Sequence, residues 1–260
     1  MILDGKKLAS EILARAKTRA ERLPHPPRIA AVVADEVAAR SYLSIKMKSA
    51  AQAGCSFEVV PLGASFEVVD AALIQLPLPP EIDRQAVLDT ISIAQDADVL
   101  SSAAREKFER GDEDALLPPV VAAIAEIFEK YNINPRGKRV IVIGQGFLVG
   151  KPVAIWLRQK LAAVSIVTES TNLARHLSVA DIIVSGAGVA RLIKPEMIKD
   201  DVVLIDAGTS ESDGVVVGDA DPACAGKCSL FTPVPGGVGP VAVAKLFENA
   251  VELASRRAVA

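Results

Sequence analysis

The segment from Arg139 to Pro152, RVIVIGQGFLVGKP, constrains the fold of this chain more than any other stretch. The apolar β-formers Val140–Ile143 run directly into Gly144, Gly146 and Gly150, and a helix-compatible stretch follows. This order is typical of the turn at which α/β proteins hold a dinucleotide pyrophosphate, because glycines let the backbone approach the phosphates and the first helical turn offers free N–H groups. The same pattern also occurs as an ordinary βα turn without a ligand, so the spacing alone leaves both interpretations open.

Composition excludes several classes of protein. The 260 residues are 50% hydrophobic and 23% charged, a profile typical of one large globular domain or two modest ones. The net charge of −3 offers no basic surface to nucleic acid or to an anionic membrane. No apolar run reaches the roughly 18 residues that span a bilayer. The first residues also lack the apolar core of a signal peptide, so we expect a cytoplasmic protein.

The cysteines and histidines indicate neither disulfides nor a metal site. Three cysteines are too few for a disulfide framework. Cys224 and Cys228 lie four residues apart, but neither His25 nor His176 is near them in sequence, whereas zinc sites usually present four ligands in pairs. We therefore expect reduced, inert thiols and no bound metal.

The first half of the chain reads as an α/β domain over residues 1–135. Apolar residues at helical spacing and short apolar runs alternate in it, which predicts a largely parallel sheet. The expected helices span residues 5–22, 38–53, 87–93 and 120–131, and the expected strands span residues 29–33, 56–62 and 70–75.

From residue 136 to residue 240 the alternation becomes regular, which predicts a doubly wound, Rossmann-type dinucleotide-binding domain. The break is placed near residue 135, where YNINPRGK supplies loop chemistry. A long amphipathic helix from residue 241 is expected to pack back on the first domain. The predicted strands span residues 139–144, 164–168, 181–186 and 201–208, with an extended piece at 230–235 and helices at 151–161, 171–179 and 194–199.

Four polar positions of the first domain are candidates for chemistry. Tyr42 and Lys46 lie four residues apart, so they project from one face of a helix as an aromatic platform beside an amine. Gln75 ends an apolar strand, where open α/β sheets place active-site residues, and Asp98 follows a helix. Each also has a plain structural interpretation as a solvated lysine, a half-buried tyrosine, a strand end or a loop acid.

The loop Thr232–Pro240, TPVPGGVGP, is the most unusual local string. Its prolines fix φ, while its glycines permit positive φ and close approach of a ligand. A rigid loop with bare backbone N–H groups suits a flat ring, and as a simple turn it would be unusually long.

Taken in order, five segments resemble one enzyme family: Tyr42–Lys46, Gln75–Pro79 (QLPLP), Gly144–Pro152, Gly218-Asp219 and Pro233–Pro240 (PVPGGVGP). The chain is similar over nearly its whole length to the bifunctional methylenetetrahydrofolate dehydrogenase/methenyltetrahydrofolate cyclohydrolase family. QLPLP and PVPGGVGP are the specific strings, whereas the glycine turn is not.

The resemblance implies roles for the candidates. Lys46 would be the catalytic lysine, Tyr42 would pack against the pterin, Gln75 would hydrogen-bond Lys46, and Asp98 would anchor the polar edge of the pterin. Hydride transfer mainly needs alignment of two flat rings, and a lysine in a desolvated pocket can relay the proton shed by water in the second reaction. The pocket where nicotinamide meets folate would be bordered by Pro235, Gly236 and Gly237.

The resemblance also implies a nicotinamide cofactor, NADP or NAD, and a homodimer. The family usually has Arg-Ser after the first glycine of the turn, where this chain has Gln145-Gly146. An acid such as Glu169, after the second strand, can accept hydrogen bonds from ribose hydroxyls and repels the extra phosphate of NADP, so NAD is favoured. The expected cofactor contacts are Gly144, Gln145, Gly146, Val149, Gly150, Glu169, Gly186, Gly208 and Thr209.

The chain also departs from the family pattern. The usual KDVDGF segment is Gln95–Leu100 (QDADVL), the usual PCTP is Pro118–Val121 (PPVV), and Ala242 replaces a threonine. A helix expected before QLPLP is missing, because only GASFEVVD fills the gap. These changes bring substrate affinity, and the survival of one of the two activities, into question.

Two other functions stay open at this point. A shikimate-dehydrogenase-like oxidoreductase also joins an α/β substrate domain to a dinucleotide domain, although QLPLP and PVPGGVGP argue against it. A degenerate, non-catalytic folate or nucleotide binder that regulates a partner would account for the altered segments.

Overall fold

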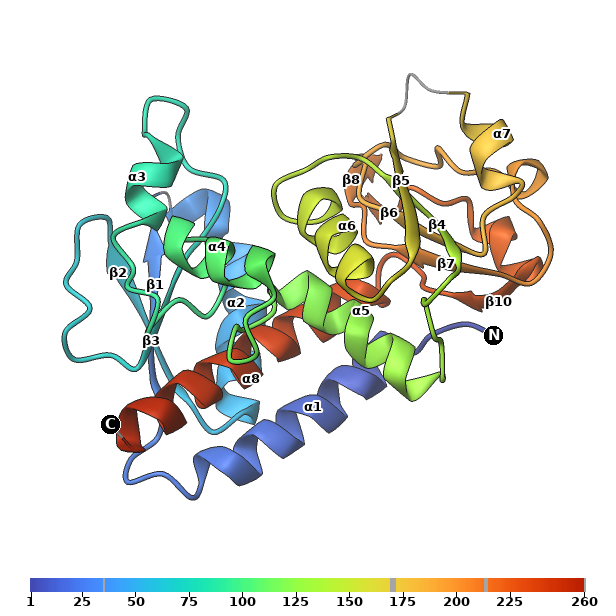
Figure 1. The fold of residues 1–260 in the computed structure, drawn as a ribbon. Helices are drawn as coiled ribbons and strands as arrows, with labels where there is room; N and C mark the ends of the chain where they lie inside the picture. The colour runs from blue at the N-terminus through green and yellow to red at the C-terminus, as the bar shows by residue number, and fades with distance from the viewer. Residues whose placement is uncertain (35, 169–171, 213–214, 260) are drawn as a thin grey trace. The chain divides into compact units, whose positions relative to one another are not determined.

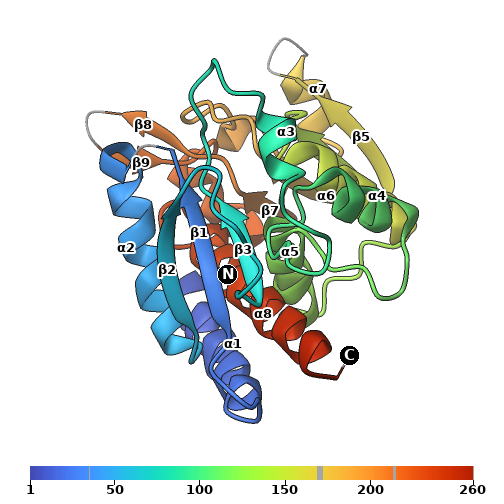
Figure 2. The same cartoon turned by 90° about the vertical axis from the view of Figure 1, so that its left-hand side faces the viewer.

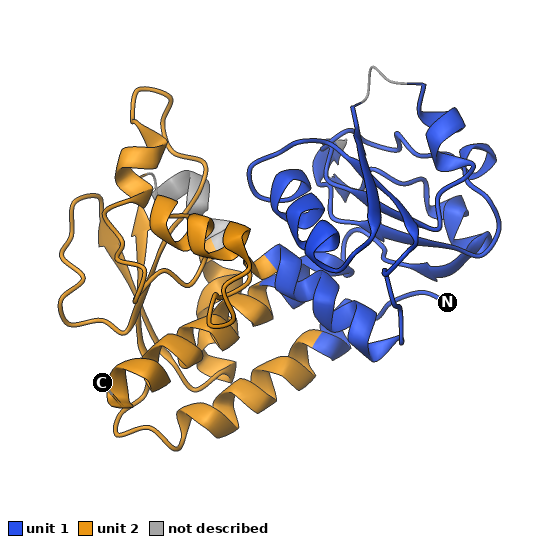
Figure 3. Ribbon diagram, in the orientation of Figure 1, with its two compact units in different colours: residues 1–8, 120–242 blue, residues 9–119, 243–260 orange. Residues whose placement is uncertain are grey.

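The computed structural model describes residues 1–34, 36–168, 172–212 and 215–259, apart from the side chains of residues 36–42 and 212. The chain forms two compact units: unit 1 comprises residues 1–8 and 120–242, and unit 2 comprises residues 9–119 and 243–260 (Figures 1 and 3).

The boundary between the units differs from the expected break near residue 135. Helix α5 (Pro119–Lys130), which the sequence pattern assigned to the first domain, lies almost wholly in unit 1. Its Phe128 packs against Trp156 of unit 1 with ring centroids 5.8 Å apart. The burial of its apolar face therefore places α5 in unit 1, and the loop that follows the helix does not mark the boundary between the units.

Unit 2 is built on a three-stranded parallel sheet in the order β2-β1-β3 (Figure 2). Five of the six residues of the central strand are buried, as in parallel sheets that are covered on both faces. The edge strand β2 instead alternates between exposed and half-buried residues over most of its length. The strands are β1 (Arg28–Val33), β2 (Ser56–Pro61) and β3 (Ala71–Ile74).

The connection from β2 to β3 contains no helix in residues 62–70, as the sequence predicts. Right-handed crossovers that step in opposite directions cover opposite faces of a sheet, so this segment crosses the face away from the helix that joins β1 to β2. The short crossover leaves a groove of about 630 Å³ lined in part by Val32, Ile74 and Phe66. The amide of Gln95 anchors the segment by donating to Phe66 O (2.6 Å) and Val69 O (2.9 Å).

The helices of the first half follow the predictions in part. The helix expected at 87–93 is wrong: α3 ends at Leu88 and begins earlier because Asp83 caps it. Helix α4 had no counterpart among the predicted elements, although Ser101 and Gly111 (φ 77°) mark its two ends. The bounds are α1 (Gly5–Ala20), α2 (Glu36–Gln52), α3 (Arg84–Leu88) and α4 (Ser102–Arg110).

Unit 1 contains a five-stranded parallel sheet in the order β10-β7-β6-β4-β5, the doubly wound arrangement that the sequence predicts. The chain leaves β4 toward β5 on one side and returns to β6 on the other, so the strand order reverses between β4 and β6. The strands are β4 (Arg139–Ile143), β5 (Ala163–Val167), β6 (Ile182–Ser185), β7 (Val202–Asp206) and β10 (Cys228–Phe231), and the helices are α6 (Gly150–Gln159) and α7 (Leu173–Leu177).

Unit 1 differs from the predicted elements in two places. The helix expected at 194–199 is only the short 3-10 turn η1 (Pro195–Met197). An antiparallel hairpin of β8 (Ser210–Ser212) and β9 (Val215–Val217) had no counterpart among the predicted elements. A second 3-10 turn, η2 (Pro222–Gly226), precedes β10.

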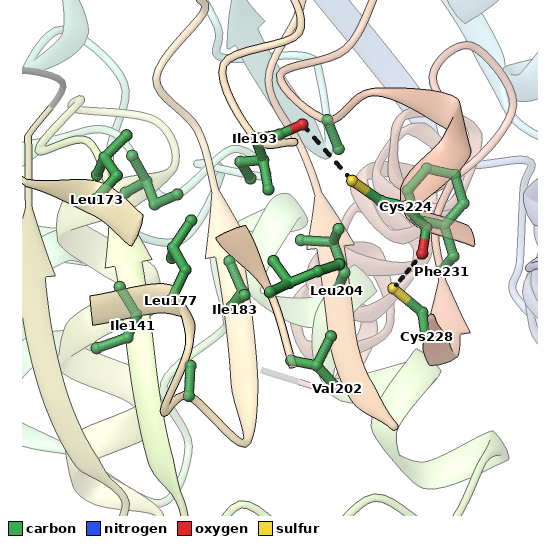
Figure 4. Close-up of a cluster of buried hydrophobic side chains, with 14 of the residues drawn as sticks. Ile141, Leu173, Leu177, Ile183, Ile193, Val202, Leu204, Cys224, Cys228 and Phe231 are labelled. Carbon is green, nitrogen blue, oxygen red and sulfur yellow. Dashed lines mark hydrogen bonds between the residues drawn. The ribbon is translucent and has the colours of Figure 1, made fainter. Parts of the chain in front are cut away.

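One hydrophobic core of unit 1 contains Ile141, Ile183 and Leu204 of the sheet together with Cys224 and Cys228 (Figure 4). All three cysteines of the chain are free and buried. Burial raises the pKa of Cys224 to about 11 and that of Cys228 to about 12, so both thiols stay protonated at neutral pH.

Helix α8 (Val238–Val259) passes from unit 1 into unit 2, where its later residues pack as expected. Phe247 contacts Phe57 of β2 with ring centroids 6.1 Å apart. Asn249 donates from Nδ2 to Ala97 O and Leu117 O, both at 3.0 Å. Across the described residues, no helix is both long and apolar enough to cross a bilayer.

Candidate active site

Helix α2 presents the first two candidates of unit 2. It follows the buried strand β1, and the backbone places Tyr42 and Lys46 one helical turn apart. The Lys46 side chain is half-buried, whereas the side chain of Tyr42 lies outside the described part of the structure. For Tyr42 and Lys46, their position on one face of the helix is therefore established from the backbone spacing.

The structure brings Asp98 into the electrostatic field of Lys46. Burial raises the pKa of Asp98 to about 6, and the nearby Lys46 cation opposes this rise while Asp96 adds to it. Two residues far apart in sequence thus interact electrostatically in unit 2.

The loop that carries Asp98 is held rigidly on both sides. Asp96, which is 2% exposed, accepts hydrogen bonds from Leu100 N (2.9 Å), Ser101 N (2.7 Å) and Ser101 Oγ (2.7 Å). Burial raises the pKa of Asp96 above its ordinary value, and these hydrogen bonds counteract that effect. Asp96 thus acts as the anchor of the loop.

Val99, the residue that follows Asp98, has a φ of 57°. A β-branched residue is rarely found in this left-handed region. Strain of this kind occurs at functional sites where the surroundings over-determine the backbone, and Val99 is 2% exposed beside the anchored Asp96.

Gln75 lies at the carboxyl end of β3 and continues the ladder, since its N–H donates to Val32 O at 2.8 Å. Its Nε2 donates to Leu76 O at 2.7 Å, and its buried Oε1 has no partner among the described residues. The expected hydrogen bond to Lys46 is therefore not formed, because an ammonium needs that oxygen as its acceptor. An unpartnered buried amide oxygen is costly and calls for a ligand or a mobile partner.

The glycine turn of unit 1 lies where the strand order reverses, between β4 and β6. Gly144 has φ 94°, and a Cβ on it would lie 2.8 Å from Gly186 O. A Cβ on Gly150 would lie 2.1 Å from Gly144 O, and one on Gly186 would lie 2.5 Å from Val149 Cγ1. The turn and the end of β6 thus pack too closely for any side chain.

The same turn has an open side. A Cβ on Gly146 would meet nothing nearer than Gly186 O at 3.9 Å, and Gln145 is exposed. The N-cap of α6, Val149, makes no side-chain hydrogen bond to the first helical turn. A bare glycine face beside a helix N-terminus fits the phosphates of a dinucleotide.

The other expected cofactor contacts follow neighbouring strands at the same edge of the sheet. Gly186 follows β6, and Gly208 and Thr209 follow β7. A Cβ on Gly208 would lie 2.0 Å from Asp219 Oδ2, so this position also excludes a side chain. Glu169 lies outside the described residues.

The proline-glycine loop of unit 1 is held by the start of the chain. Gly5 N donates to Gly236 O at 3.0 Å, and a Cβ on Gly5 would lie 2.0 Å from Gly237 O. Pro235 is exposed and follows a cis peptide bond. Gly5 was not among the predicted site residues, because no local pattern links the start of the chain to this loop.

These features define a class of α/β chains. One unit has a doubly wound sheet of the dinucleotide-binding type, and the other carries polar candidates on a helix, at a strand end and in a loop. Residues 118–258 match the family model described as the NAD(P)-binding domain of tetrahydrofolate dehydrogenase/cyclohydrolase. The bifunctional protein FolD of Hydrogenobaculum sp. is 36% identical over 98% of this chain and 99% of its own length. The FolD protein of Aquifex aeolicus is 34% identical over 99% of this chain and 96% of its own.

Solved structures agree with the sequence relatives. The FolD methylenetetrahydrofolate dehydrogenase/cyclohydrolase of Campylobacter jejuni has a TM-score of 0.93 at 29% identity, covering 99% of both chains. The Trypanosoma brucei enzyme, solved with NADP and an inhibitor, has a TM-score of 0.92 at 29% identity, covering 100% of this chain and 99% of that one. The chain belongs to the tetrahydrofolate dehydrogenase/cyclohydrolase family.

The shikimate-dehydrogenase-like alternative is supported only by a similarity of fold. A shikimate 5-dehydrogenase of Listeria monocytogenes has a TM-score of 0.51 at 11% identity, over 90% of this chain and 94% of that one. Family membership therefore supports the folate enzyme over this alternative.

Proposed function

We propose that this chain oxidises methylenetetrahydrofolate to methenyltetrahydrofolate with NAD(P) and hydrolyses the methenyl product to formyltetrahydrofolate. Family membership supports the two reactions, and one observation carries the assignment to residues. In unit 2 the Lys46 cation acts electrostatically on the carboxyl group of Asp98, and an amide oxygen of Gln75 is buried without a partner among the described residues. Polar groups with open hydrogen-bonding capacity are what the polar edge of a pterin ring requires.

In this proposal the dinucleotide binds at the glycine turn of unit 1, where Gly144, Gln145, Gly146, Val149 and Gly150 hold the pyrophosphate. When bound, it accepts the hydride that leaves the methylene carbon of the folate. The remaining contacts come from Gly186, Gly208, Thr209 and Glu169, with Pro235, Gly236 and Gly237 bordering the nicotinamide.

The residues of unit 2 act on the folate. The carboxylate of Asp98 accepts hydrogen bonds from the N–H edge of the pterin, and Tyr42 stacks on its face. In the second reaction the oxygen of a water molecule bonds to the methenyl carbon, and one of the two carbon–nitrogen bonds of that carbon then breaks, which leaves the formyl group on the other nitrogen. Lys46 relays a proton that the water loses to the nitrogen that is released. The free Oε1 of Gln75 is then an acceptor that orients the lysine.

Two finer points belong to the same proposal. Gln145, in place of the usual arginine, together with Glu169 favours NAD over NADP. We also propose that the enzyme is cytoplasmic and forms a homodimer, and light scattering after gel filtration tests the oligomeric state.

Lys46→Met provides the test, with Lys48→Met as a matched control because Lys48 is an exposed residue of the same helix. Methenyl formation is measured with NAD and with NADP, and methenyl hydrolysis is measured without a cofactor. We expect the wild type and Lys48→Met to catalyse both reactions, and Lys46→Met to lose about 100-fold or more in hydrolysis. If the wild type and Lys46→Met are equally inactive while folate still binds, the chain is a non-catalytic binder.

A further inference from the structure

Two carboxylates of unit 1 are almost completely buried at the edge of the sheet that carries the cofactor contacts. Asp206 ends β7 and is 1% exposed, and Asp219, two residues beyond β9, is 0% exposed. Neither forms an ion pair with any described residue. Burying an unpaired carboxylate is expensive, so such a pair requires an explanation.

Asp219 binds the segment that follows β6. Its Oδ2 accepts hydrogen bonds from Ser185 Oγ (2.6 Å) and Ala187 N (2.8 Å), and its Oδ1 accepts one from Val189 N (2.8 Å). These donors lie on both sides of Gly186. The close fit of Gly208 against Asp219 Oδ2 adds the segment after β7 to the same anchor.

Asp206 continues this network. Its Oδ1 accepts from Gly208 N (3.0 Å) and its Oδ2 accepts from Ala220 N (2.8 Å). Its own backbone is fixed by Thr232, whose hydroxyl accepts from Asp206 N at 2.7 Å. Together the two carboxylates join the ends of β6 and β7 to the segment around residues 218–220.

We propose that Asp219 and Asp206 are positioning residues that hold the cofactor-binding segments 186–189 and 207–209 in register. This inference rests on the proposed binding of NAD(P) by unit 1. Charged acceptors make shorter and stronger hydrogen bonds to N–H groups than neutral ones do, so they fix the direction of a glycine-containing backbone that has no side chains of its own to pack. The segments are thereby preorganised before the dinucleotide binds.

Asp219→Asn tests the proposal, because an amide cannot accept at both positions and so loses part of the network. Asp181→Asn is the matched control: Asp181 accepts from Arg139 N (2.9 Å) and Lys199 Nζ (2.5 Å) at the opposite, amino-terminal edge of the same sheet. Three quantities are measured for each variant: the Kd of NAD(P) by calorimetry, amide exchange at Ala187 and Val189, and methenyl hydrolysis without a cofactor.

We expect Asp219→Asn to weaken NAD(P) binding at least 10-fold and to accelerate exchange at both amides, with hydrolysis within twofold of the wild type. Asp181→Asn should bind the cofactor like the wild type, even where its thermal stability falls. Ser185→Ala removes one donor to Asp219 and serves if Asp219→Asn does not fold; it should weaken binding about threefold.

Unchanged cofactor affinity in Asp219→Asn, or in Ser185→Ala if that variant has to serve, overturns the positioning role. A parallel loss of hydrolysis does so as well, because it would indicate general misfolding. A wild type that fails to bind NAD(P) instead overturns the proposed function, so the two failures are distinguishable.

Discussion

The strained backbone at Val99 predicts that glycine is more stable than alanine at this buried position, the reverse of the usual order. Val99 has φ 57° and its side chain is 2% exposed. A left-handed conformation costs an L-residue about 1–2 kcal/mol, and glycine escapes this cost. Val99→Ala removes two buried methyl groups, worth about 1.6 kcal/mol, and keeps the strain of a Cβ.

We therefore expect Val99→Gly to be more stable than Val99→Ala by about 1 kcal/mol, although glycine lacks even the alanine methyl. The matched control pair is Val121→Ala and Val121→Gly. Val121 is 0% exposed but lies in helix α5, where alanine should be the more stable by about 1 kcal/mol.

The free energies of unfolding are measured in urea by circular dichroism, because the single tryptophan, Trp156, lies in unit 1 while Val99 lies in unit 2. The opposite order of alanine and glycine at the two positions is the expected result. If alanine is the more stable at both, the backbone at Val99 is not left-handed in solution and the strain argument is refuted.

Three further predictions concern Asp98 and Asn249 of unit 2. Because the pKa of Asp98 is about 6, its carboxylate form is lost as the pH falls through 6. The KM for folate should therefore rise between pH 7 and pH 5. The variant Asp98→Asn should show a high KM at every pH. The same raised pKa should make the wild type lose stability relative to Asp98→Asn as the pH rises from about 4 to about 6, since the unfolded state then binds fewer protons; equal pH profiles would contradict the burial of this group. Asn249→Leu should lower the free energy of unfolding by about 1–3 kcal/mol, because two backbone carbonyls lose the donor that they share. The free energy is measured by urea titration. Phe247→Leu, a packing change in the same helix, serves as the comparison that separates the lost hydrogen bonds from a packing defect.

Much of the fold was predictable because it depends on local chemistry. The strand-glycine-helix order at Arg139–Pro152 fixes where a parallel sheet can hold phosphate, and apolar spacing located α1, α2 and α5 closely. The elements that failed were short: α4 was missed despite its capping residues, and the expected helix at 194–199 had too weak an apolar pattern to distinguish a full helix from a 3-10 turn.

The sites divide in the same way. Lys46, Gln75 and Asp98 could be selected from sequence by residue type, by position at a strand or helix end, and by resemblance. Their mutual geometry could not, because it depends on the order of strands and on an anchored loop. The missing hydrogen bond between Lys46 and Gln75 is one example, and the support of Asp98 by Asp96 is another.

By itself the sequence determined where the long helices and the sheet strands lie and where the phosphate-type turn needs glycine, since short-range sterics and hydrogen bonding decide these features. Only the tertiary structure decided that α5 joins unit 1, that Gly5 supports the Gly236 loop, and that Asp206 and Asp219 bind segments far apart in sequence. Such contacts depend on which buried surfaces meet, and no local pattern in a single chain encodes that choice.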